Sequence, residues 1–165
     1  MAVVGEQDCS ETTARLAEAV GAELARRGAV VLTGGLGGVM EAACRGCRQA
    51  GGLSVGILPG EDALAANPYV DIPIVTDMGH ARNVILVRSA AGVVAVGGSY
   101  GTLSEIAVAL KLGKPVVGLS TWELSRPGPF QDPIVRARDP EEAVNRLWEL
   151  LAGSPGQGGR AAGEP

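Results

Sequence analysis

Short apolar runs rich in β-branched residues alternate along the chain with longer segments in which apolar residues recur every three or four positions. An apolar run of this length between turn residues is typical of a strand that is buried on both faces. Six such runs predict strands at Ala2 to Val4, Ala29 to Leu32, Leu53 to Leu58, Ile72 to Val75, Val93 to Val96 and Pro115 to Leu119. Strands that alternate with helices form βαβ units. We therefore expect a single-domain α/β fold, a Rossmann-like doubly wound and mostly parallel sheet with helices on both faces.

The pattern predicts a helix most clearly at Glu11 to Arg27. Leu16, Val20 and Leu24 recur there at four-residue spacing and form an apolar stripe that can face a sheet. Gly28 follows in the position where glycine commonly ends a helix. This segment is therefore expected to be the first crossover helix.

Two further helices are expected around the middle of the chain. The segment Ala81 to Ala91 contains four consecutive apolar residues, Val84 to Val87, and periodicity alone does not separate a buried strand from a buried helix there. Its length, and the strand that follows it at once, favour a helix. Leu103 to Leu112 has the apolar pattern of another helix, and Gly113 stands at its end.

A last helix is expected to start at Pro140 and to run to the end of the domain. Asp139 has the side chain of an N-cap, the proline lacks only an N–H that a helix start leaves free, and Glu142 completes a capping box. Residues 152–165 hold no large apolar side chain and are rich in Gly and Pro, so burial would not offset the entropy of ordering them. The domain is expected to span residues 1–151, followed by a disordered tail.

Charge and composition narrow the classes of partner. The chain has 14 basic and 18 acidic residues, a net charge of −4 and 46% apolar residues, which is typical of one globular domain. Binding of DNA or RNA depends on clustered cations, so no nucleic acid partner is expected. A small anion remains compatible, since backbone N–H groups at a helix start bind phosphate without net positive charge. The first residues contain only a short apolar run and no basic leader, so we expect a cytoplasmic protein without signal peptide or membrane contact.

Two glycine-rich segments, Thr33 to Ala43 and Val96 to Ala107, each follow a predicted strand and lead into a helix. Ligands of open parallel sheets collect at the carboxyl ends of the strands, where glycine lets the backbone turn tightly and approach an anion. The two loops are therefore expected to line one crevice that binds a nucleotide-like or phosphorylated small molecule. The candidate binding residues are Gly34, Gly35, Gly37, Gly97, Gly98, Ser99, Tyr100, Gly101 and Thr102.

Both loops also have simpler interpretations. Neither is followed by the Lys-Ser/Thr pair of a P-loop, and Met40 stands where a dinucleotide-binding fingerprint requires a third glycine. The first loop, in the alternative interpretation, is only a tight turn with close helix packing. In the second loop, Thr102 to Glu105 matches a capping box, in which Glu105 would do no more than bond the backbone at the helix start. These alternatives stay open at the level of sequence.

Cofactor and metal chemistry find little support in the residues. Pyridoxal phosphate requires a lysine near its phosphate site, but Lys111 and Lys114 flank the far end of the predicted helix, about 15 Å from the glycine turn at 1.5 Å per residue. We therefore exclude lysine decarboxylation. Cys44 and Cys47 lie in a predicted helix, and no second pair completes a zinc site. Reduced cysteines, no metal and no resident cofactor are expected.

Two side chains near the glycine turn have alternative roles. His80 is the one histidine of the chain and stands two residues before Arg82, so it either reaches a phosphate or lies on the surface at a helix start. Tyr100 lies inside the glycine loop, where it either stacks on a base or pterin ring or is an exposed loop tyrosine.

The segments Gly79 to Ala90 (GHARNVILVRSA) and Ala91 to Leu119 (AGVVAVGGSYGTLSEIAVALKLGKPVVGL) together resemble a known family. They are similar to the family-one proteins related to DprA and to the "lonely guy" phosphoribohydrolases, which have often been mislabelled lysine decarboxylases. The resemblance includes the first glycine loop and so covers most of residues 29–119. Its specific part is the pattern Gly-Gly-x-x-Gly-Thr-x-x-Glu preceded by a helical arginine.

The resemblance to the phosphoribohydrolases implies a homodimer that cleaves the N-glycosidic bond of nucleoside 5′-monophosphates. By position, the family's arginine is Arg82 and its motif glutamate is Glu105, and both attend the ribose as candidate catalytic residues. The phosphate turn corresponds to Gly98, Ser99, Gly101 and Thr102. Departure of a base from ribose develops oxocarbenium-like charge, which a nearby carboxylate stabilises.

The chain departs from these enzymes at two positions, because Val96 and Asn83 stand where they carry a proline and a lysine. The same family includes a molybdenum-cofactor carrier, a tetramer that binds a phosphorylated pterin without turning it over. Hydrolysis of a nucleoside monophosphate and non-catalytic carriage of a pterin cofactor therefore both stay open. A DNA-processing role like that of DprA is disfavoured by the acidic balance. We expect a homodimer or homotetramer, since the run Val84 to Val87 offers more apolar surface than one sheet face needs.

Overall fold

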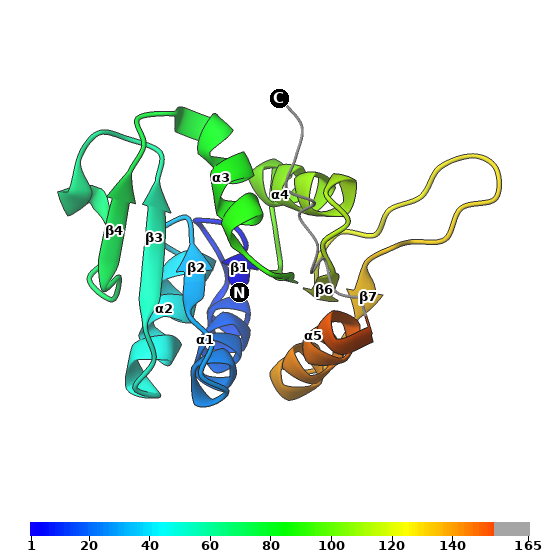
Figure 1. Cartoon of the computed structure of the whole chain (residues 1–165), viewed down its shortest axis with the longest axis horizontal. Coiled ribbons are helices and arrows are strands. Elements are labelled where there is room, and N and C mark those ends of the chain that lie inside the picture. The colour runs from blue at the N-terminus through cyan, green and yellow to red at the C-terminus, as the bar shows by residue number, and fades with distance from the viewer. Residues whose placement is uncertain (154–165) are drawn as a thin grey trace, which may run out of the picture.

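In the computed structural model, which describes residues 1–153, seven short strands form one sheet in the order β4-β3-β2-β1-β5-β6-β7 (Figure 1). Every pair of neighbouring strands is parallel. The strands are β1 Ala2–Val4, β2 Val31–Thr33, β3 Ser54–Leu58, β4 Ile72–Val75, β5 Val93–Val96, β6 Val116–Leu119 and β7 Val135–Arg136. The strand order runs outward from β1 and from β5, and its direction reverses between these two neighbours. The expected doubly wound α/β fold is confirmed.

Five helices and two short 3₁₀ turns connect the strands within the described residues. They are α1 Glu11–Arg26, α2 Val39–Gln49, η1 Ala63–Ala65, η2 Gly79–Ala81, α3 Arg82–Ser89, α4 Tyr100–Lys111 and α5 Pro140–Gly153. Helices α1, α2 and α5 cover one face of the sheet, and α3 and α4 cover the other (Figure 1). Right-handed crossovers produce this arrangement when the strand order reverses.

The two faces of the sheet carry two cores because side chains along each strand alternate in direction. On β5, Val94 and Val96 pack with α1, α2 and α5, whereas Val93 and Ala95 pack with α3 and α4. All four side chains are fully buried. Burial on both faces explains why the strands read as uninterrupted apolar runs instead of an alternating pattern.

Helix α1 begins and ends where local chemistry favours it. Ser10 is its N-cap and accepts a hydrogen bond from the backbone N–H of Thr13 at 3.1 Å. At the other end, Gly28 has a φ of +74°, the left-handed conformation in which glycine commonly ends a helix. Val20 and Leu24 of the predicted stripe are fully buried, which confirms that this stripe faces the sheet.

Helices α1 and α2 approach each other closely at two glycines. A side chain at Gly21 of α1 would stand 2.0 Å from the carbonyl oxygen of Ala43, and one at Gly46 of α2 would stand 1.9 Å from that of Glu18. Backbone lies against backbone at both points, so only glycine fits there without moving a helix. This contact fixes the position of α2, whose N-terminus leads out of the first glycine loop.

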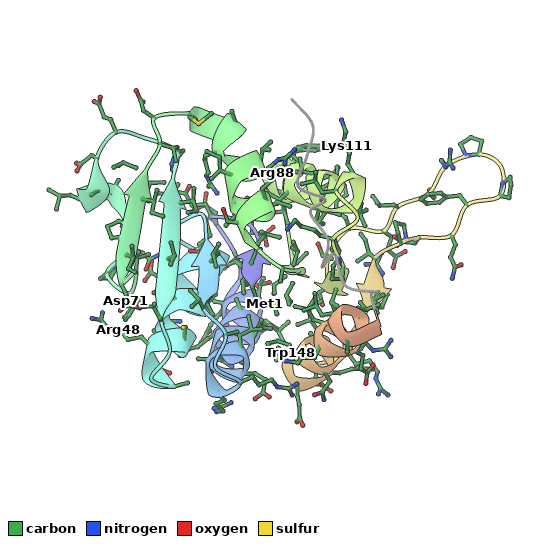
Figure 2. All side chains as sticks on the ribbon, viewed as in Figure 1. Met1, Arg48, Asp71, Arg88, Lys111 and Trp148 are labelled. Carbon is green, nitrogen blue, oxygen red and sulfur yellow. The ribbon has the colours of Figure 1, made fainter. Side chains whose placement is uncertain are left out.

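Helix α5 packs back onto α1 through Trp148, which is labelled in Figure 2. The guanidinium carbon of Arg27 lies 5.5 Å from the centroid of the tryptophan ring, a cation–π contact. Arg27 also bonds the side chain of Asn145. Trp148 is therefore held on the face of the molecule that carries α1 and α5, away from α3 and α4.

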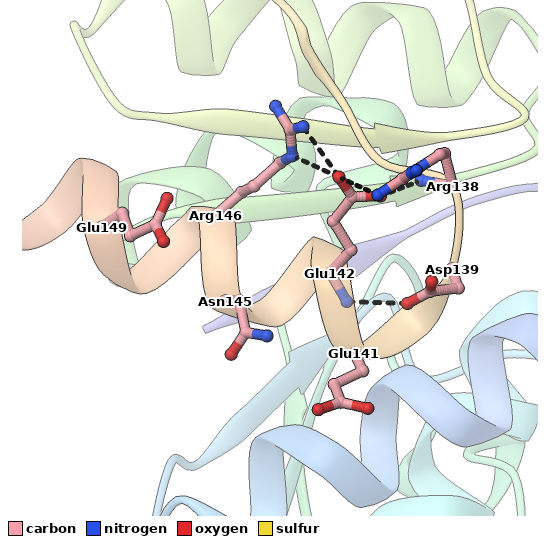
Figure 3. Close-up of a pocket in the computed structure, with 7 residues that line it drawn as sticks. All are labelled: Arg138, Asp139, Glu141, Glu142, Asn145, Arg146 and Glu149. Carbon is pink, nitrogen blue, oxygen red and sulfur yellow. Dashed lines mark hydrogen bonds and ion pairs between the residues drawn. The ribbon is translucent and has the colours of Figure 1, made fainter.

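The N-terminus of α5 is capped largely as predicted (Figure 3). The backbone N–H of Glu142 donates to the carboxylate of Asp139 at 2.8 Å, which confirms the capping aspartate. The Glu142 carboxylate, however, accepts from the backbone N–H of Arg138 at 2.8 Å and not from that of the cap. Helix α5 ends at Gly153, two residues beyond the predicted end of the domain, and the rest of the predicted tail lies outside the described residues.

Two elements differ from those predicted. Strand β7 was not expected, because Val135 and Arg136 are too short a run to show a pattern and are defined only by parallel pairing with β6. Helix α4 begins at Tyr100, three residues before the predicted start at Leu103. The ambiguous apolar segment after Ala81 is helix α3, as expected. Within the described residues, no helix is long and apolar enough to cross a membrane.

Candidate functional site

A cleft of about 150 Å³ lies at the carboxyl edge of the sheet, where the strand order reverses between β1 and β5. Open parallel sheets bind ligands at this switch point, because the loops from neighbouring strands diverge there. The lining residues come from the loops after β1, β2, β3 and β5, from η2 and from α2, α3 and α4: Gly5, Gln7, Leu36, Met40, Pro59, His80, Arg82, Asn83, Ser99, Gly101, Thr102 and Glu105.

The N-terminus of α4 forms one wall of the cleft. Ser99 is the N-cap residue, but its side chain makes no capping hydrogen bond, and the amides of a first helical turn have no intrahelical partner. Thr102 is 1% exposed, and its hydroxyl has no hydrogen-bond partner within residues 1–153. These donors lie at the positive end of the helix dipole. Amides, dipole and a buried hydroxyl together suit a phosphate.

The glycine turn before α4 is shaped by backbone geometry. Gly97 has a φ of +59° and Gly98 a φ of +134°, and the second conformation is one that glycine alone adopts freely. A side chain at Gly98 would stand 2.8 Å from Cβ of Thr102. Because α4 already begins at Tyr100, Thr102 lies inside the helix and is not its cap. The capping-box alternative for Glu105 is therefore wrong, and the carboxyl is free for another role.

Arg82 and Glu105 meet in the cleft although they are 23 residues apart. The guanidinium Nη1 lies 3.5 Å from Oε1 of the carboxyl, and the two side chains are 9% and 8% exposed. Burial raises the pKa of Glu105 to about 7, against the opposing effect of the guanidinium. Burial also lowers the pKa of Arg82, but a guanidinium stays protonated in proteins. The pair therefore carries net positive charge whenever Glu105 takes up a proton.

Arg82 has a buried donor, its Nε, without a hydrogen-bond partner within residues 1–153. A buried donor without a partner costs about 1–3 kcal/mol, so such groups are rare in proteins and each one requires an explanation, such as a bound ligand, ion or water. Together with the hydroxyl of Thr102, this donor is suited to an acceptor-rich ligand.

The first glycine loop builds the wall behind Arg82. A side chain at Gly34 would stand 2.4 Å from Nη2 of Arg82, so this glycine makes room for the guanidinium. Gly35 has a φ of +77°, and its carbonyl accepts from the backbone N–H of Asn67 at 2.8 Å. Gly37 has open surroundings, since the nearest atoms to a side chain there lie 3.8 Å away. None of the three glycines lines the cleft itself, although all three were expected to bind the ligand.

The loop after β1 contributes residues that the sequence interpretation did not include. The Glu6 carboxylate accepts a hydrogen bond from the backbone N–H of Gly98 at 2.9 Å, so this amide is already bonded within the protein. Gln7 lines the cleft. Both follow a predicted strand directly, and that position at the carboxyl edge was the signal that could have found them.

Asn83 stands beside Arg82 where the phosphoribohydrolases carry lysine. Its side chain is 7% exposed and lines the cleft. The amide nitrogen donates to the hydroxyl of Ser104 at 2.8 Å, which ties α3 to α4. The residue that replaces a cation is therefore neutral and engaged in joining the two helices.

A second hollow of about 280 Å³ lies next to the cleft, since His80 and Gly101 line both. Tyr100 and Ser104 complete its lining. Tyr100 is 81% exposed, so its ring stands at the mouth of the site and not within it.

A larger hollow of about 520 Å³ lies on the surface of α5, far along the chain from the glycine loops (Figure 3). Three of its charged side chains already pair with one another, since Glu142 bonds both Arg138 and Arg146. These two guanidinium groups lower the pKa of Glu142 to about 2. A solvated ion-pair cluster of this kind is common on helices, so this hollow is not a candidate site.

Lysine and cysteine chemistry lies away from the cleft. Lys111 is the last residue of α4 (Figure 2), and the ammonium of Lys114 donates to the backbone carbonyls of Arg88 and Ala90. Cys44 and Cys47 are buried free thiols, and burial raises the pKa of both. Within residues 1–153, no three side chains of His, Cys, Asp or Glu gather as a metal site would require.

Known proteins are similar to this chain over most of its length. The model described as the SLOG cluster4 family matches residues 1–144. An uncharacterised protein of Archaeoglobus fulgidus is 49% identical over 143 residues, which are 87% of this chain and 90% of that protein. The likeness covers nearly the whole of the described fold.

Solved structures extend the comparison. The molybdenum cofactor binding protein of Rippkaea orientalis has a TM-score of 0.81 at 35% identity, over 91% of this chain and 95% of that one. The molybdenum cofactor carrier protein of Chlamydomonas reinhardtii has a TM-score of 0.80 at 37% identity, over 92% and 96%. DprA of Streptococcus pneumoniae has a TM-score of 0.68 at 20% identity, over 87% and 60%, and is similar in fold alone. The resemblance drawn from the sequence is confirmed.

Proposed function

Because the chain belongs to the SLOG cluster4 family and is similar to molybdenum cofactor binding and carrier proteins, we propose that it binds a phosphorylated pterin such as molybdenum cofactor, with the phosphate in the cleft, and carries it without turnover. The observation that carries this proposal is the pair of buried donors without partners, Arg82 Nε and the Thr102 hydroxyl, in residues that both line the cleft. Two buried donors without partners destabilise the protein when the cleft is empty. Beside an uncapped helix start, the same donors favour the binding of a phosphate.

The phosphate would be held by the start of α4. The amides of Tyr100, Gly101 and Thr102 belong to the first helical turn, and the helix dipole favours an anion there. The Gly98 amide takes no part, since Glu6 already accepts from it. This assignment moves the start of the predicted phosphate turn from Gly98 to Tyr100 and keeps Gly101 and Thr102.

Carriage is favoured over hydrolysis by two sets of observations. Two solved structures that align with more than 90% of this chain are named for molybdenum cofactor binding or carriage. In addition, Asn83 replaces the lysine of the phosphoribohydrolases, and its amide donates a hydrogen bond to the hydroxyl of Ser104. The cation that those enzymes carry next to the arginine is therefore absent from this wall of the cleft.

One observation keeps the hydrolase as a second candidate. Glu105 has a pKa of about 7 and lies beside Arg82 in the cleft. A carboxylate in that position would stabilise oxocarbenium-like charge as a base leaves the ribose of a nucleoside 5′-monophosphate. The same residues that hold a phosphate ester for carriage would then also support cleavage.

Binding is tested with molybdenum cofactor released from a denatured molybdoenzyme. The protein is mixed with the cofactor and gel-filtered, and protein-bound molybdenum and pterin are quantified. Wild-type protein should retain both in equal amounts, and Thr102→Val should weaken retention roughly tenfold or more, as expected for the loss of a hydrogen bond to a charged group. Thr12→Val, an exposed position on α1, is the matched control. Wild-type protein that retains neither molybdenum nor pterin would exclude the carrier.

Hydrolysis is tested separately by incubation with AMP and an N6-substituted analogue, followed by chromatography for released base. The carrier proposal expects no release from either compound. Release by wild-type protein that is abolished in Glu105→Gln would replace carriage by the phosphoribohydrolase.

A further inference from the structure

Trp122 connects the loop after β6 to the start of α4, the helix that is proposed to hold the phosphate. Its indole N–H donates to the backbone carbonyl of Ser99 at 3.1 Å. The same carbonyl accepts the first helical bond of α4, from the backbone N–H of Leu103 at 3.0 Å. Trp122 therefore holds the residue at which the helix begins, and the sequence interpretation assigned it no role.

The indole also supports Tyr100, the next residue along the chain. The two ring centroids are 5.6 Å apart with an interplanar angle of 36°, a tilted arrangement within the range that aromatic pairs prefer. Tyr100 lines the second hollow but is 81% exposed. An aromatic side chain that is so exposed and yet held by a second ring presents a preformed apolar surface.

The sizes of the two hollows indicate what this surface faces. The cleft of about 150 Å³ is smaller than the roughly 300–1,000 Å³ of ordinary ligand pockets, so it accommodates a phosphate and little more. A ligand that is bound there by its phosphate has to extend into the adjoining hollow of about 280 Å³, between His80 and Tyr100. The part of the ligand beyond the phosphate therefore lies beside an aromatic side chain.

We propose that Tyr100 is the residue on which the planar fused ring of the ligand stacks, and that Trp122 is a positioning residue that holds Tyr100 and Ser99 for this purpose. The inference rests on the proposed function and names the part of the ligand that the outer hollow recognises. Stacking of a heteroaromatic ring on an aromatic side chain is tolerant of ring identity. The site is thus suited to phosphorylated ligands that carry a flat aromatic ring, such as a pterin, and not to phosphate esters in general.

The experiment compares a ligand that has the ring with one that lacks it. Neopterin monophosphate carries a pterin ring on a phosphorylated three-carbon chain, and glycerol 3-phosphate is the matched compound without a ring. Dissociation constants are measured by calorimetry for wild-type protein and for Tyr100→Leu, Tyr100→Phe, Trp122→Phe and Trp148→Phe. Trp148 packs against Arg27 on the other face of the molecule and is the control tryptophan.

Wild-type protein should bind the pterin compound at least tenfold more tightly than glycerol 3-phosphate, a factor in the range of one aromatic stack. Tyr100→Leu should lose this factor and leave glycerol 3-phosphate unchanged, whereas Tyr100→Phe and Trp148→Phe should keep it. Trp122→Phe retains a ring but loses the hydrogen bond to Ser99, so it should lose part of the preference for the pterin compound over glycerol 3-phosphate. Since Tyr100 is exposed, its substitution leaves the core intact.

Fluorescence supplies a readout that a purely structural role would not change. The chain has two tryptophans, so Trp148→Phe leaves Trp122 as the one indole emitter. The pterin compound should quench this emission and glycerol 3-phosphate should not. Equal weakening of both compounds in Tyr100→Leu, or equal affinity of wild-type protein for both, overturns the inference while phosphate binding stands. Wild-type protein that binds neither compound and retains no cofactor overturns the proposed function as well.

Discussion

Glu105 illustrates at the residue scale how burial sets the chemistry of the cleft. A carboxyl group ordinarily titrates near 4.5, but removal from water disfavours its charged form and raises its pKa to about 7, even though Arg82 opposes this shift. Near neutral pH the carboxyl is divided between its two forms while the guanidinium stays charged. Binding of an anion in the cleft and protonation of Glu105 therefore favour each other.

Glu105→Gln should reveal this carboxyl in the pH dependence of stability. A pKa that is raised in the folded state means that its contribution is fully present below about pH 4.5 and is lost as the pH rises through about 7. The free energy of unfolding of wild-type protein, relative to the variant, should fall between pH 4.5 and pH 8 by up to about 3 kcal/mol. Urea denaturation across this range measures it. The exposed Glu149→Gln on α5 should show no such trend, and a flat difference for Glu105→Gln would contradict the buried carboxyl.

Gly34→Ala tests whether the first glycine loop acts through Arg82. The new Cβ would stand 2.4 Å from Nη2 of the guanidinium, so the arginine has to move away from its place beside Glu105. We expect affinity for glycerol 3-phosphate to fall roughly tenfold, about 1.4 kcal/mol, as measured by calorimetry. Gly37→Ala, three residues further in the same loop with open surroundings, is the control. Equal affinities for the two variants would show that this loop does not position the arginine.

At the scale of elements, α1 and α2 act as one unit because their backbones touch at Gly21 and Gly46. The position of α2 determines where the first glycine loop ends, and Leu36 and Met40 of this region line the cleft. Close packing of the two helices, away from the cleft, therefore contributes to the shape of the cleft.

Gly46→Ala should destabilise the protein although alanine favours a helix. The propensity gain is about 1 kcal/mol, but a Cβ 1.9 Å from the carbonyl oxygen of Glu18 forces the two helices apart, and overpacking of this kind costs about 1–3 kcal/mol. We expect a net loss of up to about 2 kcal/mol in the free energy of unfolding, measured with urea. Gly153→Ala at the end of α5 has nothing within 4 Å of the new Cβ and should be neutral. A stabilised Gly46→Ala would mean that the helices separate at little cost.

Across the whole molecule, several exposed apolar side chains gather on and just after the edge strand β4. Ile72, Ile74 and Val75 are each more than 40% exposed, and Met78 after the strand is 48% exposed. The predicted surface from Val84 to Val87 is smaller than expected, because Leu86 and Val87 are fully buried in the core beneath α3. An uncovered edge strand of this composition is a site where chains associate.

We predict that a second copy of the chain covers β4, in a homodimer or homotetramer. Light scattering coupled to gel filtration at micromolar concentration should give two or four chains, and Ile74→Lys should shift the mass toward the monomer, because a buried unpaired charge opposes association. Gln131→Lys, an equal change of charge at an exposed position outside the strand, should leave the mass unchanged. A monomeric wild-type protein would contradict this prediction.

The pattern of residues along the chain is enough to predict the fold class and the edge of the sheet at which the candidate site lies. Apolar runs without alternation arise only where both faces of a strand are buried, and this requirement acts locally, so β1, β5 and α1 could be predicted within a few residues of their bounds. Glycines directly after β2 and β5 likewise indicated the carboxyl edge, because turns that need a positive φ, as at Gly35 and Gly97, are encoded by the residue that occupies them.

The groups that meet in the cleft are brought together by tertiary contacts, which the sequence pattern does not contain. Arg82 reaches Glu105 across 23 residues, Glu6 reaches the Gly98 amide across 92, and Trp122 reaches Ser99 across 23. Such contacts depend on the strand order and on how the helices pack over the sheet, which are sums of many small packing terms that no local pattern contains. The burial that raises the pKa of Glu105, and leaves Arg82 and Thr102 each with an unpaired donor, exists only after those elements have come together.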